Sequence, residues 1–293
     1  MSCLTAFSGE NWCCEQCGWM PPQLNGVKLL APHILGVTES YDPAWYDELA
    51  ALEAGNFWFV ARNRLIRWLA QRYISRTGKY LEVGCGTGFV LQMLHSTFPR
   101  WKISATEVHL EGIEFARKRV PEGVTFFQMD ACAIPFSSEF DVIGAFDVIE
   151  HIRDDTTAIG QIHSALKPGG IFFLSVPQHM FLWSKYDQVG GHFRRYSVSE
   201  LEDKLKIHGF TVIASTSFNS FLLPLMMLSR YLKKRETDAG MDFLEDLRIS
   251  PSTNFWLSTI LKVEFQLVRL GLRFPWGGSR IVVARKAPSG RKN

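Results

Sequence analysis

Three side chains capable of acid–base or metal chemistry lie close together in the segment DVIEHI. Asp147, Glu150 and His151 stand at positions i, i+3 and i+4, a spacing that places side chains on one face of a helical turn. His151 could accept a proton from a substrate. Alternatively, the three could bind a divalent metal ion, or Glu150 and His151 could simply hydrogen-bond the turn. We predict that His151 and Asp147 are catalytic and that no metal ion is bound.

A second candidate segment, GGHFRRYS, contains one histidine and two arginines. His192 could contact a substrate, and Arg194 or Arg195 could pair with a carboxylate or a phosphate on it. The alternative is structural, because Arg195 and Tyr196 could fix this segment to the sheet before the next helix. We keep His192 as a third candidate catalytic residue.

The segment YLEVGCGTGF, residues 80–89, forms a glycine-rich turn behind a short apolar run. Backbone N–H groups of such a turn, with a helix N-terminus behind them, favour negative charge. No Gly-Lys-Ser/Thr follows, which excludes a phosphate-binding P-loop. Phe89 stands where the dinucleotide fingerprint requires its third glycine. A tight strand-to-helix turn without a ligand is the alternative to a binding site at Gly84, Gly86 and Gly88.

Two carboxylates stand at the ends of the next predicted strands. Glu107 ends KISATE, where a carboxylate can accept hydrogen bonds from both hydroxyls of a ribose. Asp130 ends VTFFQMD, where a carboxylate can accept one from the amino group of an adenine. Nothing beside these two residues is shaped for phosphate. The ligand implied is therefore a nucleoside without phosphates.

The rest of the sequence alternates between strand and helix patterns that would position these segments. The alternation predicts an α/β fold with a doubly wound, mostly parallel seven-stranded sheet, in which ligands bind beyond the carboxyl ends of the strands. The predicted strands are 79–84, 102–107, 124–130, 140–149, 171–177, 211–218 and 279–286, and the helical patterns between them include 89–98, 110–120, 154–166 and 197–210.

Composition divides the chain into five segments. They are an irregular N-terminal segment with a cysteine knuckle (1–40), N-terminal helices that Gly55 could interrupt (41–78), a ligand-binding core (79–217), a helical insertion (218–277), and the final strand with a tail (278–293).

We call the insertion 218–277 the lid. It leaves the carboxyl end of a strand, so it should lie over the ligand-binding edge, and it is rich in Phe, Leu, Met and Trp. Two or three amphipathic helices are expected there. Simple packing on the domain is one interpretation. The others are an apolar acceptor pocket or contact with a membrane surface.

The bulk properties of the chain narrow the remaining possibilities. A net charge of +3 over 293 residues, with scattered basic side chains, argues against nucleic acid as a partner. No apolar run reaches the ~18 residues of a membrane span, and the first residues lack the pattern of a secretory signal, so we expect a cytoplasmic chain. Only Cys14 and Cys17 form a C-x-x-C pair, whereas a closed zinc site needs four ligands. The sequence therefore leaves open whether this cysteine knuckle binds zinc.

In combination these motifs resemble the class I S-adenosylmethionine-dependent methyltransferases, closest to the ubiquinone-biosynthesis-type or methyltransferase type 11-like branch. The resemblance covers residues 79–210 in the family's order and implies a Rossmann-like methyltransferase fold. The matching segments are LEVGCGTG, TE at 106–107, MDACAIPF, FDVIGAFDVIEHI, LKPGGIFFLSVP and HFRRYS.

The resemblance implies S-adenosyl-L-methionine as the cofactor and methyl transfer to oxygen, nitrogen or carbon of a small acceptor, which the lid composition suggests is apolar or lipid-like. Some family members with Glu-x-x-Glu-His in place of Asp147-x-x-Glu150-His151 bind a metal ion. The rival is a non-catalytic S-adenosylmethionine-binding protein or zinc-knuckle adaptor, against which the intact cofactor acids argue.

The resemblance also implies which residues hold the cofactor. They are Gly84, Cys85, Gly86 and Gly88 at the methionine part, Glu82 at that turn and the amino group, Glu107 at the ribose, Asp130 and Ala131 at the adenine, and Phe146 and Asp147 near the sulfonium.

Overall fold

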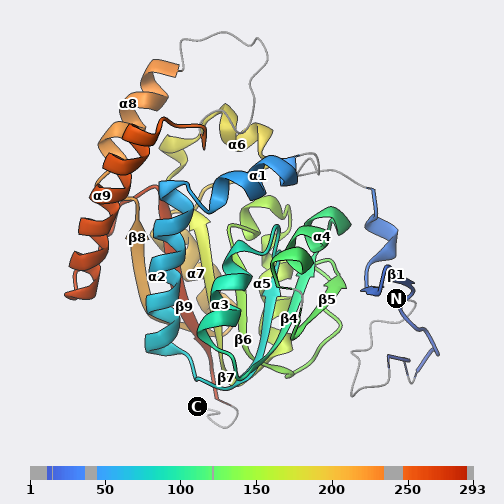
Figure 1. Cartoon of the computed structure of the whole chain (residues 1–293). Helices are drawn as coiled ribbons and strands as arrows, with labels where there is room; N and C mark the ends of the chain where they lie inside the picture. The colour runs from blue at the N-terminus through green and yellow to red at the C-terminus, as the bar shows by residue number, and fades with distance from the viewer. Residues whose placement is uncertain (1–11, 15, 37–44, 121, 234–246, 289–293) are drawn as a thin grey trace.

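The computed structural model describes residues 12–14, 16–36, 45–120, 122–233 and 247–288, and in this part of the chain one mixed sheet forms the centre of the molecule (Figure 1). The strand order is β1-β2-β5-β4-β3-β6-β7-β9-β8. Strands β2 to β7 pair in parallel, whereas β9 is antiparallel to both β7 and β8. The strands are β1 (Gln23–Leu24), β2 (Val27–Leu29), β3 (Gly78–Val83), β4 (Trp101–Glu107), β5 (Val124–Gln128), β6 (Phe140–Phe146), β7 (Leu166–Pro177), β8 (Phe210–Phe218) and β9 (Ser279–Lys286).

Helices cover both faces of this sheet, because the apolar side chains of the strands alternate between two cores. Tyr80 and Phe173 face one core, with α2, α3, α4 and α9, while Leu81 and Phe172 face the other, with α5 and α7. The predicted mostly parallel α/β fold is thus confirmed. The helices are α1 (Tyr46–Glu53), α2 (Phe57–Tyr73), α3 (Phe89–Thr97), α4 (Leu110–Arg119), α5 (Asp155–Ala165), α6 (Lys185–Val189), α7 (Val198–Ile207), α8 (Leu223–Lys233) and α9 (Pro251–Arg269), with short 3₁₀ turns η1 (Pro32–Ile34), η3 (Ile149–His151) and η4 (Met180–Leu182).

The N-terminal segment departs from the expectation that residues 1–40 are irregular. Strands β1 and β2 extend the seven predicted strands at the β5 edge. The Gln128 side chain fixes this edge by accepting from the N–H of Ala31 (3.1 Å) and donating to its carbonyl (3.0 Å). Buried Val27 and Leu29 add apolar contacts. Strands of two and three residues are too short to show an alternating pattern in the sequence. Residues 1–11, 15 and 37–40 of this segment lie outside the described residues.

The N-terminal helices divide near Gly55, as predicted. Helix α1 ends at Glu53, and the Asn56 side chain caps α2 by accepting from the Trp58 N–H at 2.9 Å. Buried residues of α2, including Leu65, Ile66 and Leu69, pack on the sheet, as the 3.6-residue period requires.

The described part of the lid consists of α8 and α9, which lie at the outer edge of the molecule (Figure 1). Helix α9 runs beside α2, where Asn254 accepts from the Phe57 N–H and Trp68 meets Phe265 edge-on. The buried Glu264 carboxylate accepts from the N–H groups of Ser220 and Phe221 at 2.8 Å each, which connects α9 to the start of α8. Among the described residues, no helix has the length and hydropathy of a membrane span.

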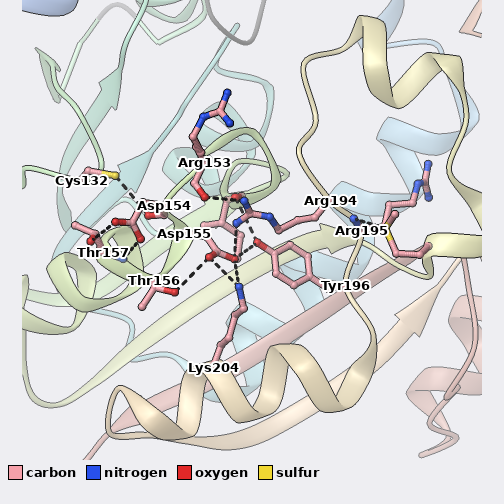
Figure 2. Close-up of polar contacts among 12 residues, drawn as sticks. Cys132, Arg153, Asp154, Asp155, Thr156, Thr157, Arg194, Arg195, Tyr196 and Lys204 are labelled. Atoms are coloured by element: carbon pink, nitrogen blue, oxygen red, sulfur yellow. Dashed lines mark hydrogen bonds and ion pairs between the residues drawn. The ribbon is translucent and has the colours of Figure 1, made fainter.

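The segment after β7 is held by a charged cluster around Asp155 at the start of α5 (Figure 2). Its buried carboxylate accepts from the Tyr196 hydroxyl at 2.7 Å and pairs with Lys204 at 2.6 Å and Arg194 at 2.9 Å. Burial opposes ionisation of Asp155, but the hydrogen bonds from Lys204, Tyr196 and Arg194 outweigh it and lower its pKa. This supports the structural role considered for Tyr196 and adds Arg194 to it.

Replacing Asp155 by alanine should lower the free energy of unfolding by about 3 kcal/mol, because two cationic groups and a buried hydroxyl lose their shared partner. The neighbouring Asp154→Ala is the matched control. Asp154 is the exposed N-cap of α5, accepting from the Thr157 N–H at 2.9 Å, and its removal should cost about 1 kcal/mol. Urea unfolding followed by tryptophan fluorescence measures both.

The same pair of variants has a defined pH dependence. Because the folded-state pKa of Asp155 is lowered, its contribution is complete above the unfolded value of about 4 and is lost as the pH falls through the folded value. The stability gap between the wild type and Asp155→Ala should therefore narrow in acid. Equal costs for the two variants at neutral pH would contradict the role of Asp155.

Candidate functional site

A cavity of about 710 Å³ opens at the carboxyl ends of β3, β4, β5 and β6. Helices α1 and α2 also contribute to its wall, as does the lid. Of the predicted site residues only Gly88 does not line it. The predicted residues that do are Glu82, Gly84, Cys85, Gly86, Glu107, Asp130, Ala131, Phe146, Asp147, His151 and His192.

The three glycines of the turn share a positive φ but have different surroundings. All three have a positive φ, namely 67° at Gly84, 50° at Gly86 and 81° at Gly88. A Cβ on Gly84 would lie 2.6 Å from Val148, and one on Gly88 would lie 2.8 Å from the Ala116 Cα of α4. A Cβ on Gly86 would meet no atom within 4 Å. Gly88 therefore allows close packing of the turn against α4, whereas Gly86 leaves room in the cavity.

The two predicted nucleoside acceptors are both held by backbone N–H groups. Glu107 accepts from Gly86 at 2.9 Å through one oxygen and from Val108 at 2.7 Å through the other. One Asp130 oxygen accepts from the Cys132 N–H at 2.7 Å. A carboxylate has about four acceptor positions, so both side chains are oriented and still have positions to offer toward the cavity.

Glu82 lies under the glycine turn and is fully desolvated. Its carboxyl group accepts a 2.9 Å hydrogen bond from the Tyr80 hydroxyl. Burial raises the pKa of Glu82 to about 8, although Tyr80 and Arg62 act in the opposite direction. At neutral pH the group is therefore mostly protonated, and a nearby cation would favour its charged form.

Arg62 is a cavity residue that the sequence analysis did not single out. It projects from α2, with its guanidinium 4.7 Å from the Trp58 ring centroid, and forms an ion pair with Asp147. Its side chain is only 8% exposed. Asp147 itself has a φ of 56°. The only sequence signal for Arg62 is a charged residue within the apolar stripe of a helix.

A second group missed by the sequence analysis fixes α1 over the glycine turn. Buried Glu53 accepts from the Thr87 hydroxyl at 2.6 Å and pairs with Arg119 of α4 at 2.6 Å. Burial raises the pKa of Glu53, while Arg119 opposes this shift. Helix α1 is thereby joined to two elements that surround the cavity.

Beyond the glycine turn, Glu150, His151 and His192 bring one possible ligand atom each within 4.8 Å of one another. The Glu150 carboxylate is wholly buried, and neither oxygen has a hydrogen-bond partner among the described residues. Burial and the nearby Asp147 raise its pKa well above the usual range. Burial and the neighbouring His192 lower the pKa of His151 to about 3, so its imidazole is neutral.

His192 is the better oriented of the two histidines. Its Nδ1 lies 3.0 Å from Asp187, which also pairs with Arg195 at 2.7 Å. Burial opposes ionisation of Asp187, but the His192 hydrogen bond and the Arg195 charge outweigh it and lower the Asp187 pKa to about 2. An ionised carboxylate thus fixes the His192 ring, which lines the cavity. Arg195 has the structural role considered for it.

The structure changes which residues could form the alternative metal site. The sequence spacing grouped Asp147 with Glu150 and His151, but the Asp147 carboxylate is paired with Arg62. The structure instead gathers Glu150, His151 and His192, a carboxylate and two imidazoles, which together suit a divalent transition metal. Where the chain is described, no comparable group includes Cys13, Cys14 and Cys17.

The lid forms the remaining wall of the cavity. Leu222, Leu225 and Met226 line it from the α8 side, and Leu257 lines it from α9. Phe57 and Trp58 of α2 are also part of the wall. One continuous space therefore joins the polar strand ends to an apolar region.

The residues present fit S-adenosylmethionine. Gly86 leaves space beside the turn, the oriented carboxylates of Glu107 and Asp130 offer acceptors, and the desolvated Glu82 lies where a cationic group would stabilise its charge. The volume is also within the range of about 300–1,000 Å³ typical of small-molecule sites.

Comparisons with known proteins agree with this geometry. Residues 57–215, more than half of the chain, match a family described as "Methyltransferase domain". A probable S-adenosylmethionine-dependent methyltransferase of Mycolicibacterium smegmatis is 26% identical over 167 residues, which are 56% of this chain and 63% of that protein. The ubiquinone/menaquinone biosynthesis C-methyltransferase of Desulfotalea psychrophila is 25% identical over 32% of this chain and 39% of that protein. The matching segments thus span less than two thirds of these relatives.

Among solved structures, phosphoethanolamine N-methyltransferase 2 of Haemonchus contortus, in complex with S-adenosyl-L-methionine, shares the fold. The TM-score is 0.57 at 20% identity, and the match covers 87% of this chain and 59% of that one. The resemblance predicted from the motifs is confirmed by the family match and the curated relatives. The chain belongs to the methyltransferase-domain family, within the S-adenosylmethionine-dependent class.

Proposed function

We propose that this protein transfers a methyl group from S-adenosyl-L-methionine to a small, apolar or lipid-like acceptor whose nucleophile arrives protonated. The observation that carries the proposal is the single cavity in which Glu107 and Asp130 share one space with Leu222 and Met226 of the lid. A cofactor at the strand ends and an acceptor under the lid would meet inside this space.

The cofactor, when bound, supplies an activated methyl group on a cationic sulfur with a neutral leaving group. The chain's own task is to align an acceptor and to exclude water, which can lower a barrier by about 7–11 kcal/mol. Glu107, Asp130 and Glu82 would hold the nucleoside and amino groups. Arg62 is a cation in the same wall and supports binding of a carboxylate.

The acceptor is proposed from the lid, because α8 and α9 lie beyond residue 215, where the family match ends. Most of the lid side chains on the cavity are apolar, namely Leu222, Leu225, Met226, Leu247 and Leu257, and the polar ones are Asn219, Ser229 and Arg230. Such a wall favours an acceptor with an extended apolar part.

His192 is proposed to receive the proton that the acceptor's nucleophile loses. The Asp187 carboxylate contacts Nδ1 and leaves Nε2 for the acceptor, so that the carboxylate would also stabilise the imidazolium that forms. His151, whose neutral ring lies against His192 with centroids 4.5 Å apart, would help to position it.

The proposed cofactor site predicts micromolar binding of S-adenosylmethionine and of its demethylated product, and no measurable binding of NAD. Asp130→Ala and Glu107→Ala should each weaken binding by about 1–3 kcal/mol, the cost of losing hydrogen bonds to a charged group. Glu111→Ala, at an exposed position of α4, is the matched control and should bind as the wild type does. Titration calorimetry measures all four proteins, and NAD binding would overturn the assignment.

The base role predicts that His192→Ala lowers kcat by about 100-fold or more, the size of a general-base contribution, with nearly unchanged cofactor affinity. The exposed His33→Ala controls for the loss of a histidine as such. Steady-state kinetics and calorimetry on the same preparations separate the two effects. An unaffected kcat in His192→Ala would remove His192 from the reaction.

The metal alternative is tested in the same assay by chelation. We expect EDTA to leave turnover unchanged. If chelation abolished turnover and a divalent ion restored it, and if Glu150→Gln weakened the binding of that ion, the group Glu150, His151 and His192 would be a metal site instead.

The acceptor class is tested by mass spectrometry after incubation with the cofactor and a panel of detergent-dispersed alkyl phenols, hydroxyquinones and fatty acids. Met226→Ala should raise the acceptor KM about tenfold, through the loss of apolar contact, while cofactor affinity stays within a few-fold. Leu270→Ala, in the lid but not on the cavity, should leave KM unchanged. Cofactor binding without turnover of any acceptor would favour the rival, a non-catalytic binding protein.

A further inference from the structure

The lid has a second face, which no described part of the chain covers. Most of the large apolar side chains that the described residues expose lie on α8, on α9 or on η4 and the loop beside it. They include Leu225, Leu228 and Leu232, spaced i, i+3 and i+7 on α8. Single exposed apolar side chains are ordinary, whereas a concentration of them on neighbouring elements indicates an interaction surface.

On α9 and its C-cap Leu270, exposed basic and large apolar side chains recur every seven residues as adjacent pairs. Phe255 with Trp256 is followed by Lys262 with Val263 and then by Arg269 with Leu270. A seven-residue step drifts only about 20° around a helix, so the three pairs form one outward stripe. Aromatic side chains thus lie at one end of the stripe and cations lie along it.

In the described part of the lid, the exposed charges have one sign. Among described residues of the lid, Arg248, Lys262, Arg269 and Arg273 are exposed, Arg248 being paired with Glu48 of α1, and no acidic side chain is exposed. The one acidic residue in the described part of the lid, Glu264, is buried, and its carboxylate accepts hydrogen bonds from the N–H groups of Ser220 and Phe221. An apolar surface with cations and without exposed acids complements anionic head groups.

The exposed surface continues into the cavity. Leu225 is 52% exposed and also lines the cavity, while α8 packs beside η4, whose Phe181 lies 6.4 Å from the Trp276 ring. Tryptophan and tyrosine are the residues that prefer the interface between lipid and water, and Trp256, Trp276 and Tyr231 are all exposed here. The cavity mouth and the apolar face therefore belong to one surface.

We propose that the lid docks on an anionic lipid bilayer through the exposed faces of α8 and α9, so that an apolar acceptor enters the cavity along Leu225 without crossing water. The docking is inferred from the exposed surface of the lid alone, whereas the route of the acceptor rests on the proposed function. An amphipathic helix pair of this kind would lie in the head-group region rather than cross the bilayer.

The test is flotation of the full-length protein with vesicles of phosphatidylcholine alone or mixed with phosphatidylglycerol. We expect the protein to float with the anionic mixture and to be largely released at high salt, because exposed charges are then screened. Leu228→Glu and Trp256→Glu should each weaken vesicle binding about tenfold. Lys262→Ala should weaken binding to the anionic mixture about fivefold.

Ile207→Glu is the matched control, since Ile207 is 81% exposed on α7 and lies outside the lid. It should float as the wild type does. The replaced side chains are exposed, so melting temperature and cofactor binding should stay unchanged and would reveal a folding defect. Failure of the wild type to float, or flotation of both glutamate variants at the wild-type level, would overturn the proposal.

Other occupants of the surface give different results. If the wild type did not float but was a dimer that Leu228→Glu made monomeric, the surface would be an interface between copies and the lipid proposal would be wrong. Methylation of a dispersed acceptor by a protein that does not float would contradict docking alone. Flotation by a protein that methylates no acceptor would support docking and contradict the proposed function.

Discussion

One hydrogen bond between two strand ends organises the cavity: the Gly86 N–H donates to Glu107 at 2.9 Å. The parallel register of β3 and β4, which sets Val83 opposite Thr106, brings the glycine turn beside this carboxylate. A turn with three positive-φ glycines has little preference of its own for one shape, so a fixed anion at its centre sets the direction of its N–H groups. Since β5 and β6 end at the same edge, Asp130 and Asp147 then face the space that Gly86 leaves open.

Desolvation decides the electrostatics of this space. Burial raises the pKa values of Glu82 and Glu150, because a buried carboxylate without a cation favours its neutral form. Asp147 and Asp187 have cations of their own, Arg62 and Arg195. The cavity thus contains acids whose charge depends on a cationic partner. A ligand with ammonium and sulfonium groups supplies that partner, whereas the phosphates of NAD would add to the repulsion.

Local sequence patterns predicted the seven core strands and placed the residues that follow strand ends at the cavity, because a strand end fixes both the edge and the face of the side chain. They could not predict Arg62 or Glu53, which reach the cavity from helices and meet partners 85 and 34 residues away. The spacing of Asp147, Glu150 and His151 suggested one helical turn, but the positive φ at Asp147 turns its carboxylate toward Arg62. The pairing of His192 with Asp187 depends on the course of an irregular segment after β7, and no periodicity encodes that course.

The lid unites two requirements that a single buried element could not satisfy. Its inward side must complete the cavity wall, and Leu222, Met226 and Leu257 line that wall. Its outward side is left with apolar side chains such as Leu228, which burial could have stabilised by about 1.5–3 kcal/mol each. These two neighbouring helices leave apolar side chains exposed to water, and the described part of the lid exposes no acidic side chain. Such a surface is consistent with burial against a partner outside the chain. On the proposed function, the core common to the family would provide the cofactor chemistry, and the lid would determine which molecules reach it.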